Sequence, residues 1–295
     1  MVKNKILDGL IYLAKTIVLL GVLLVITVVL SQELGALLGE KELELIENEQ
    51  VIPLAMLELI GMQALQQVPA DIEVFFLIIM VLNLVVIGKI MGHSIEVMRN
   101  GVRKGAFSFL YVQTMHVWVY FVRLVLSVLV MALVTWGLYI AGVFVCSSFV
   151  FTGLEAVFLT NANVVLSTMA FRGLGVLVLM VSFSVICGVK QIYSMDGVDF
   201  TLCVMGVSFV LGNAYKIPQL IGQKQIEQMV NAQQMMEITR GLKEIRFLCP
   251  YSWLNPFNIH NRILSTRMIW SYVLVAVAIM IMAGVIFCLR DWEEV

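Results

Sequence analysis

The chain has 295 residues, of which 61% are hydrophobic and 13% are charged, and its formal net charge at pH 7 is −1. Soluble domains carry about a quarter charged residues, so this composition excludes an ordinary soluble domain and predicts a polytopic membrane protein. A net charge near zero gives no field that would attract nucleic acid. The five cysteines have no CxxC spacing and the three histidines lie far apart in the sequence, so neither set predicts a metal site.

Six apolar segments are predicted to cross the membrane as helices, which gives an all-α fold in a single transmembrane domain over residues 1–295. A bilayer requires about 20 apolar residues for each helical crossing. The predicted spans are about residues 11–30, 74–90, 117–145, 164–189, 198–211 and 268–289. Six spans place both termini on one side, and the lysines and arginines near the termini and after the second span predict that this side is cytoplasmic.

Two long segments, residues 31–73 and 212–267, are predicted to be helical extracellular loops. The first carries nine acidic residues against the single base Lys41, and its leucines recur near helical spacing. The second carries an excess of basic residues, which runs against its placement outside, although long loops obey the charge rule weakly. The opposite charges of the two loops predict that they lie together on the outer face.

Residues 91–112, which follow the second span, concentrate charge between two long apolar segments. The apolar and charged side chains fall on opposite faces of a helix. The apolar face consists of Ile95, Met98 and Val102, and the charged face consists of Glu96, Arg99 and Arg103. Because Gly101 and Gly105 weaken a helix, we predict a short amphipathic helix at the membrane surface that ends near Lys104. Two interpretations stay open here, a basic loop that only sets topology and a helix that docks a soluble partner.

Arg172 is the only charge well inside the fourth predicted span. It follows Val164 by eight residues, which places it about 12 Å below the outer end of that span. A central arginine costs about 2.5 to 3.5 kcal/mol on insertion scales, so its side chain is expected to reach a polar partner. It either snorkels to the outer interface or faces a dimer interface or cargo path, with Glu155 or a headgroup as partner. The neighbouring Gly173 and Gly175 would allow close helix approach.

Short elements near the last span and before the third carry a resemblance to a known family. Leu254-Asn255-Pro256-Phe257 is similar to a Leu-Ser/Asn-Pro-Phe element before the last span, and Phe287-Cys288-Leu289-Arg290-Asp291 is similar to a terminal Phe-x-x-Arg-Asp. The pattern that enters the third span is matched by Glu96, Gly105, Phe109-Leu110, His116 and Arg123, with His116 in place of an Arg and Arg123 in place of a Lys, and with its Pro and Ser absent. In these elements, and in span order, the chain resembles the ABC-2 type permeases, the membrane subunits of type V ABC exporters. Its long acidic first loop departs from the shortest members.

The resemblance implies a half-transporter of the bacterial cell membrane, in which two copies of the chain form the translocation path and bind two copies of a separate ATPase. It implies that residues 91–112 form a coupling helix, with Glu96, Met98, Arg99 and Arg103 at the ATPase, and it makes Arg172 a candidate for the path. The chain contains no GxxxxGK[ST] phosphate loop, so ATP and Mg²⁺ would bind the partner, and this chain would be no enzyme and hold no cofactor.

The amino-acid composition of the spans favours an amphipathic cargo, because they are rich in Leu, Val, Ile and Met and poor in polar groups. Small toxin or antimicrobial peptides are the first expectation from the resemblance. A lipid, drug or polysaccharide exporter is one alternative, and a membrane immunity or scaffold protein that only binds a partner is another. An intramembrane protease is disfavoured, because the chain has no GxSG and no separated pair of intramembrane aspartates.

Overall fold

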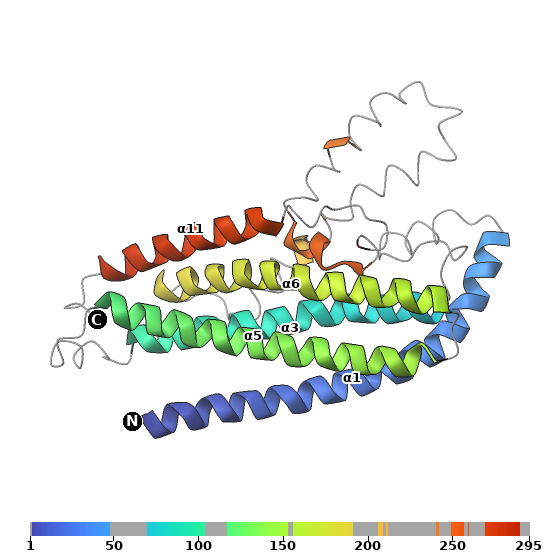
Figure 1. Cartoon of the computed structure of the whole chain (residues 1–295), viewed down its shortest axis with the longest axis horizontal. Helices are drawn as coiled ribbons and strands as arrows, with labels where there is room; N and C mark the ends of the chain where they lie inside the picture. The colour runs from blue at the N-terminus through green and yellow to red at the C-terminus, as the bar shows by residue number, and fades with distance from the viewer. Residues whose placement is uncertain are drawn as a thin grey trace. The chain divides into compact units, whose positions relative to one another are not determined.

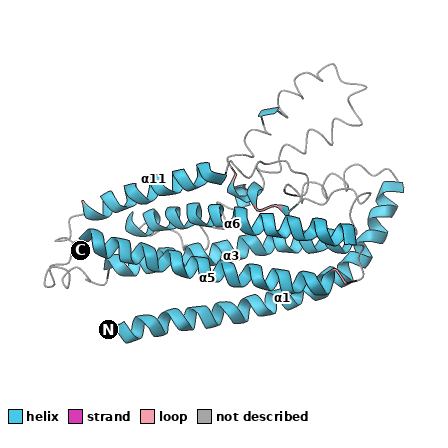
Figure 2. Ribbon diagram, viewed as in Figure 1, coloured by secondary structure: helices cyan, strands magenta, loops and turns pink. Residues whose placement is uncertain are grey.

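The computed structural model describes helices and short turns, with no strand in the described part of the chain (Figure 2). The described residues are 2–47, 70–103, 117–152, 156–190, 206–208, 211, 240–241, 249–256, 259 and 269–289. The main elements are α1 (Val2–Glu47), α3 (Ala70–Arg103), α5 (Val117–Val150), α6 (Ala156–Lys190), the 3-10 turn η1 (Pro250–Trp253) and α11 (Ile269–Cys288). The predicted all-α fold is confirmed.

Within the described residues, five helices contain stretches long and apolar enough to cross a membrane. These are Ile11–Glu33, Ile72–Val102, Val117–Val150, Ala156–Lys190 and Ile269–Cys288. The protein is therefore a multi-pass membrane protein, as its composition predicts. The fifth predicted span, residues 198–211, lies largely outside the described residues, and only 206–208 and 211 of it are described, as helix. Most residues of the two predicted outer loops, 31–73 and 212–267, also lie outside the described part of the chain.

The described helices are longer than the predicted spans. The helix α1 continues to Glu47, so the helical segment expected at the start of the first loop, residues 31–47, is continuous with the first span instead of separate from it. Residues 146–163 were expected to form an outer loop, but α5 reaches Val150 and α6 begins at Ala156. Helices of 34 and 35 residues measure about 51 to 53 Å, well beyond the roughly 30 Å of a hydrocarbon core.

The helix α3 corrects the prediction of a separate surface helix. It runs unbroken from Ala70 to Arg103, so residues 91–103 continue the second span, and the predicted residues 104–112 lie outside the described part. Packing outweighs the weak helix propensity of glycine here, because Gly101 is buried and sits against the side chain of Leu124 in α5. The predicted end of the helix near Lys104 lies outside the described residues.

The chain divides into two compact units. Of the helices labelled in Figure 1, α3, α5 and α6 are each divided between the units, whereas α1 belongs wholly to unit 1 and α11 wholly to unit 2. Unit 1 comprises Met1–Asn83, Leu138–Phe171 and Met205–Leu264. Unit 2 comprises Leu84–Gly137, Arg172–Val204 and Ser265–Val295. We describe each unit by itself.

In unit 1, α1 packs on α5 through one narrow stripe and leaves most of its surface apolar and open. The buried stripe repeats every three or four residues and consists of Thr16, Leu20, Leu24, Thr27 and Ser31. Gly142 of α5 sits against the side chain of Leu24, and the Cys146 thiol donates to the Leu24 carbonyl at 3.7 Å. Because Thr27 and Ser31 donate to carbonyls of their own helix at 2.8 and 2.7 Å, their burial leaves no unsatisfied hydroxyl.

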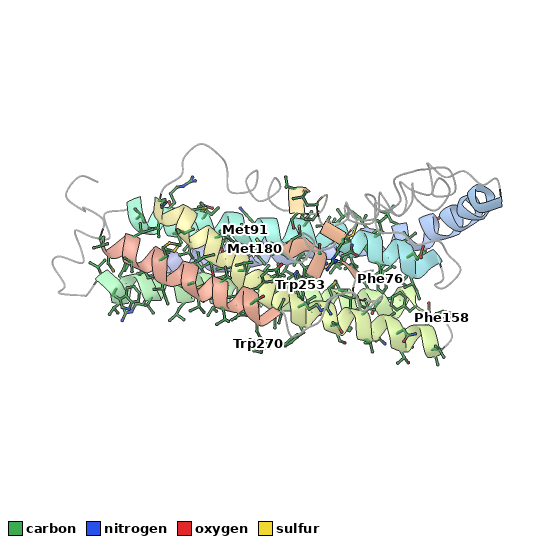
Figure 3. All side chains as sticks on the ribbon, turned by 90° about the horizontal axis from the view of Figure 1, so that it is seen from above. Phe76, Met91, Phe158, Met180, Trp253 and Trp270 are labelled. Atoms are coloured by element: carbon green, nitrogen blue, oxygen red, sulfur yellow. The ribbon has the colours of Figure 1, made fainter. Side chains whose placement is uncertain are left out.

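In unit 2, α11 packs along α5 and α6 at two levels. Near its end, the ring of Phe287 lies 5.1 Å from that of Phe121 and stacks on Tyr120 at 6.4 Å. Near its beginning, Ile269 sits against Gly175 of α6. Trp270 beside it is 62% exposed and projects away from the helix (Figure 3). Apart from Ser271 at its beginning, the exposed residues of α11 are apolar or aromatic, so this face suits lipid.

Candidate functional site

The carboxyl-terminal end of α3 forms the most tightly packed part of unit 2, and it contains the predicted coupling residues. Ile95, Met98 and Val102 are all buried, and Met98 is 0% exposed. A methyl group added at Gly188 of α6 would lie only 2.5 Å from Met98 Cβ. The apolar stripe that the sequence placed at a membrane surface is therefore the contact between α3 and its neighbours in the protein. Met98 holds the packing together and is not available to a soluble partner.

The charged face of the same turns stays accessible. Glu96 is exposed, and Arg99 and Asn100 are partly exposed. The side chain of Arg103 lies outside the described part, although its backbone ends the helix. The predicted coupling set is thus reduced to Glu96 and Arg99 among the residues whose side chains are described.

Arg172 lies in the middle of α6, and its side chain is 3% exposed. Since α6 begins at Ala156, Arg172 is 16 residues into the helix, about 24 Å from its start, and not the 12 Å expected from a start at Val164. Its side chain is therefore enclosed by other parts of this chain. Glu155, the partner that the sequence suggested, lies outside the described residues.

Sequence reasoning missed a buried polar cluster in unit 1 that joins three helices and η1. The Tyr139 hydroxyl of α5 donates to Asn83 Oδ1 of α3 at 2.8 Å. The amide Nδ2 of Asn83 donates to the Leu254 carbonyl at 3.2 Å and to the Met169 sulfur of α6 at 3.4 Å. Asn83, Tyr139 and Leu254 are each 0% exposed. The lone asparagine in the apolar run of the second span was the available signal, because a membrane-buried amide seeks a partner on another helix.

The two carboxyl-terminal elements that carry the family resemblance each contain fully buried residues among those that the structure describes. Leu254 and Asn255 follow η1 and lie at 0% exposure beside Trp253, which is labelled in Figure 3. The hydrogen bond from the Asn83 amide to the Leu254 carbonyl fixes the element before the last span to α3. Phe287, the first residue of the terminal element, is also 0% exposed and belongs to the aromatic contact with α5. Leu254 and Phe287 therefore hold the fold, whereas Cys288 and Leu289 of the terminal element are exposed.

No group of three or more His, Cys, Asp or Glu able to hold a metal ion occurs among the residues that the structure describes. The four cysteines in that part, Cys146, Cys187, Cys249 and Cys288, are free thiols. Burial raises the pKa of the Cys249 thiol, and a hydrogen bond with Ser208 opposes part of that rise. The thiol is thus mostly protonated at neutral pH, as expected of a cysteine that packs and does not react.

Comparison of the chain with protein-family models, with curated proteins and with solved structures found no match.

Proposed function

We propose that the chain is the membrane permease subunit of an ATP-driven exporter of the ABC-2 type. Two copies form the path for an amphipathic cargo, with small peptides as the first candidate, and each copy binds one separate ATPase subunit. The chain carries no phosphate loop, so the partner hydrolyses ATP. In this proposal both termini lie in the cytoplasm of a bacterial cell.

The observation that carries the proposal is the burial of Leu254 and Phe287, one residue from each of the two elements on which the resemblance rests. Leu254 accepts a hydrogen bond from a membrane-buried amide, and Phe287 is enclosed by aromatic rings of α5. Leu254 and Phe287 are each 0% exposed, so these two positions of the family pattern lie in the packed interior, and this supports the architecture that the resemblance implies.

The end of α3, together with residues 104–112, is the part proposed to contact the ATPase. A docking surface needs charges that orient the partner and a rigid support beneath them. Glu96 and Arg99 supply the charges, and the buried stripe around Met98 supplies the support. Since α3 is one continuous helix, a movement at this end is transmitted along its whole length.

Purification with native partners tests the class of protein. A tagged full-length chain, extracted from its own membrane in mild detergent, is expected to co-purify with a soluble protein that has a phosphate loop and hydrolyses ATP. Hydrolysis is expected to be blocked by vanadate. A membrane immunity or scaffold protein would instead be recovered with a partner that lacks ATPase activity, and that result would end the transporter proposal.

Substitution of the docking charges is expected to uncouple the complex. Glu96→Ala and Arg99→Glu should each lower ATP turnover about fivefold, which corresponds to about 1 kcal/mol of interface energy. The matched control is Lys190→Glu, which reverses an exposed cation at the end of α6 in the same unit. An equal loss in this control would attribute the effect to overall charge. Full turnover in both α3 variants, with the ATPase bound, would remove the docking role.

Arg172 is proposed to serve the transport path from within the protein. We expect Arg172→Leu to insert and to bind the ATPase but to lose most export, because a buried guanidinium has no substitute in an aliphatic side chain. Arg172→Lys, which keeps the charge, should retain part of the export activity. Peptides released into the medium are measured by mass spectrometry, with the amount of chain in the membrane as control. Full export by the leucine variant would make Arg172 a packing residue.

A further inference from the structure

The start of α5 presents three aromatic side chains to the end of α11. The ring of Phe287 lies 5.1 Å from that of Phe121 and stacks on that of Tyr120 at 6.4 Å, with 28° between the stacked planes. A methyl group added at Gly284 would overlap the Trp118 ring and lie 3.0 Å from Phe121 Cε1, so these rings also close on the backbone of α11. The end of α11 is therefore seated on a rigid aromatic surface of α5.

Tyr120 has a second contact, with the last described turns of α3. Its hydroxyl donates to the Gly101 carbonyl at 3.4 Å. Leu124, one turn later in α5, fills the rest of this approach, since a methyl group added at Gly101 would lie 2.7 Å from Leu124 Cδ1. Gly101 is buried and follows Arg99 by two residues and Glu96 by five. Tyr120 thus touches α11 with its ring and the proposed docking turns of α3 with its hydroxyl.

The contacts that α3 and α11 make with α6 lie at different levels. Met98 of α3 sits against Gly188, and Ile269 of α11 sits against Gly175. These two glycines are 13 residues apart, about 20 Å along α6. The contacts with α6 hold each helix in place, but they do not bring the two helix ends together. Tyr120 does so within one side chain.

We propose that Tyr120 is a positioning residue that couples the docking turns of α3 to the end of α11. A displacement of α3 at Gly101 moves the Tyr120 hydroxyl, and the planar ring passes this movement to Phe287. Because Phe287 is 0% exposed, its ring has no free space into which it could turn away, and coupling through packed side chains of this kind is well established. The use of this link for ATP-driven movement rests on the proposed function; the link itself does not.

Hydrogen exchange of the full-length chain in detergent, without an ATPase, tests the link. Phe287→Leu removes the stacked ring from α11, and we expect the amides of residues 97–103 in α3 to exchange about fivefold faster, as the loss of one ordinary interaction implies. In the Tyr120→Phe background, which keeps the ring but lacks the hydroxyl, the change at Phe287 should raise this exchange no further. The matched control is Tyr139→Phe, which removes a hydroxyl from the part of α5 that belongs to unit 1.

The complex with the ATPase tests the use of the link. Cys288 is an exposed thiol at the end of α11, directly after Phe287, so its reactivity reports on this end. The chain is prepared with its other four cysteines replaced by alanine. We expect ATP with vanadate to change the rate at which N-ethylmaleimide alkylates Cys288 at least about fivefold, the lower end of usual coupling between sites. Tyr120→Phe should abolish this change while the ATPase stays bound.

Each arm has a result that would overturn the proposal. Unchanged exchange of residues 97–103 in Phe287→Leu, or an equal rise in Tyr139→Phe, would mean that no specific link joins the two helix ends. A Cys288 rate that ignores nucleotide, or a response that survives in Tyr120→Phe, would mean that the link does not carry the movement. If no ATPase accompanies the chain, the proposed function fails, and the exchange measurement still decides whether the link exists.

Discussion

A single methyl group added at Gly173 is expected to destabilise the protein by about 2 kcal/mol, the typical cost of overpacking a filled interior. In Gly173→Ala the new carbon would overlap the six-membered ring of Trp136 and would lie 2.7 Å from Cε2 and 2.8 Å from Cη2. Trp136 is 2% exposed, so its rigid ring has no room to move aside. The apparent unfolding temperature in detergent, followed by intrinsic fluorescence, should fall by several degrees.

The chain supplies a matched control for this substitution on the facing helix. At Gly137 an added methyl group meets nothing within 4 Å, so Gly137→Ala should be neutral, or stabilising by up to about 1 kcal/mol, because alanine favours a helix. The double variant Gly173→Ala with Trp136→Phe should lose less than the sum of the two single changes, since the smaller ring removes the overlap. Equal stability of the two alanine variants would show that α5 and α6 do not approach so closely.

Removal of the buried amide of Asn83 should loosen the connection between η1 and the helices of unit 1. Asn83→Leu keeps the volume roughly constant but leaves the Leu254 carbonyl without its donor and the Tyr139 hydroxyl without its closest acceptor. Each orphaned group costs about 1 to 3 kcal/mol, so we expect a loss of about 3 kcal/mol. Cys249, which is now buried beside η1, should become accessible to alkylation, and mass spectrometry of the alkylated chain measures this directly.

Tyr139→Phe separates the two parts of this cluster. It removes the hydroxyl that donates to Asn83 but leaves the bond from Asn83 to the Leu254 carbonyl in place. We expect a smaller loss, about 1 kcal/mol, and a Cys249 that stays protected. If Asn83→Leu leaves both the unfolding temperature and the reactivity of Cys249 unchanged, the buried amide does not hold η1.

The sequence predicts the helices because apolar runs of sufficient length have no other stable form in a bilayer. It predicts their ends poorly, and the segment between the third and fourth predicted spans explains why. Ser148 and Thr160 lower the hydropathy there, which favours a loop, yet their hydroxyls donate to carbonyls of their own helix at 2.6 and 2.8 Å. A polar residue that bonds within its own turn does not end a helix.

Periodicity separates the faces of a helix but does not identify what each face meets. The stripe of Met98 has the same spacing whether it lies on lipid or on another helix, and only the contact with Gly188 of α6 decides between them. The sequence did not predict the Asn83 cluster for a related reason. The partners of Asn83, Tyr139 and Leu254, are 56 and 171 residues away in the sequence. Interactions of that separation leave no local pattern.

The shortness of α11 limits which membranes the protein fits. Arg267 and Arg290 bracket this segment and leave 22 residues between them, about 33 Å of helix, whereas α3, α5 and α6 exceed that length by many residues. Long helices adapt to a thicker bilayer by tilting less or projecting less, but a segment that barely spans has no such reserve. Hydrophobic mismatch at α11 therefore sets the upper limit of acyl-chain length that the protein accepts without thinning the lipid around it.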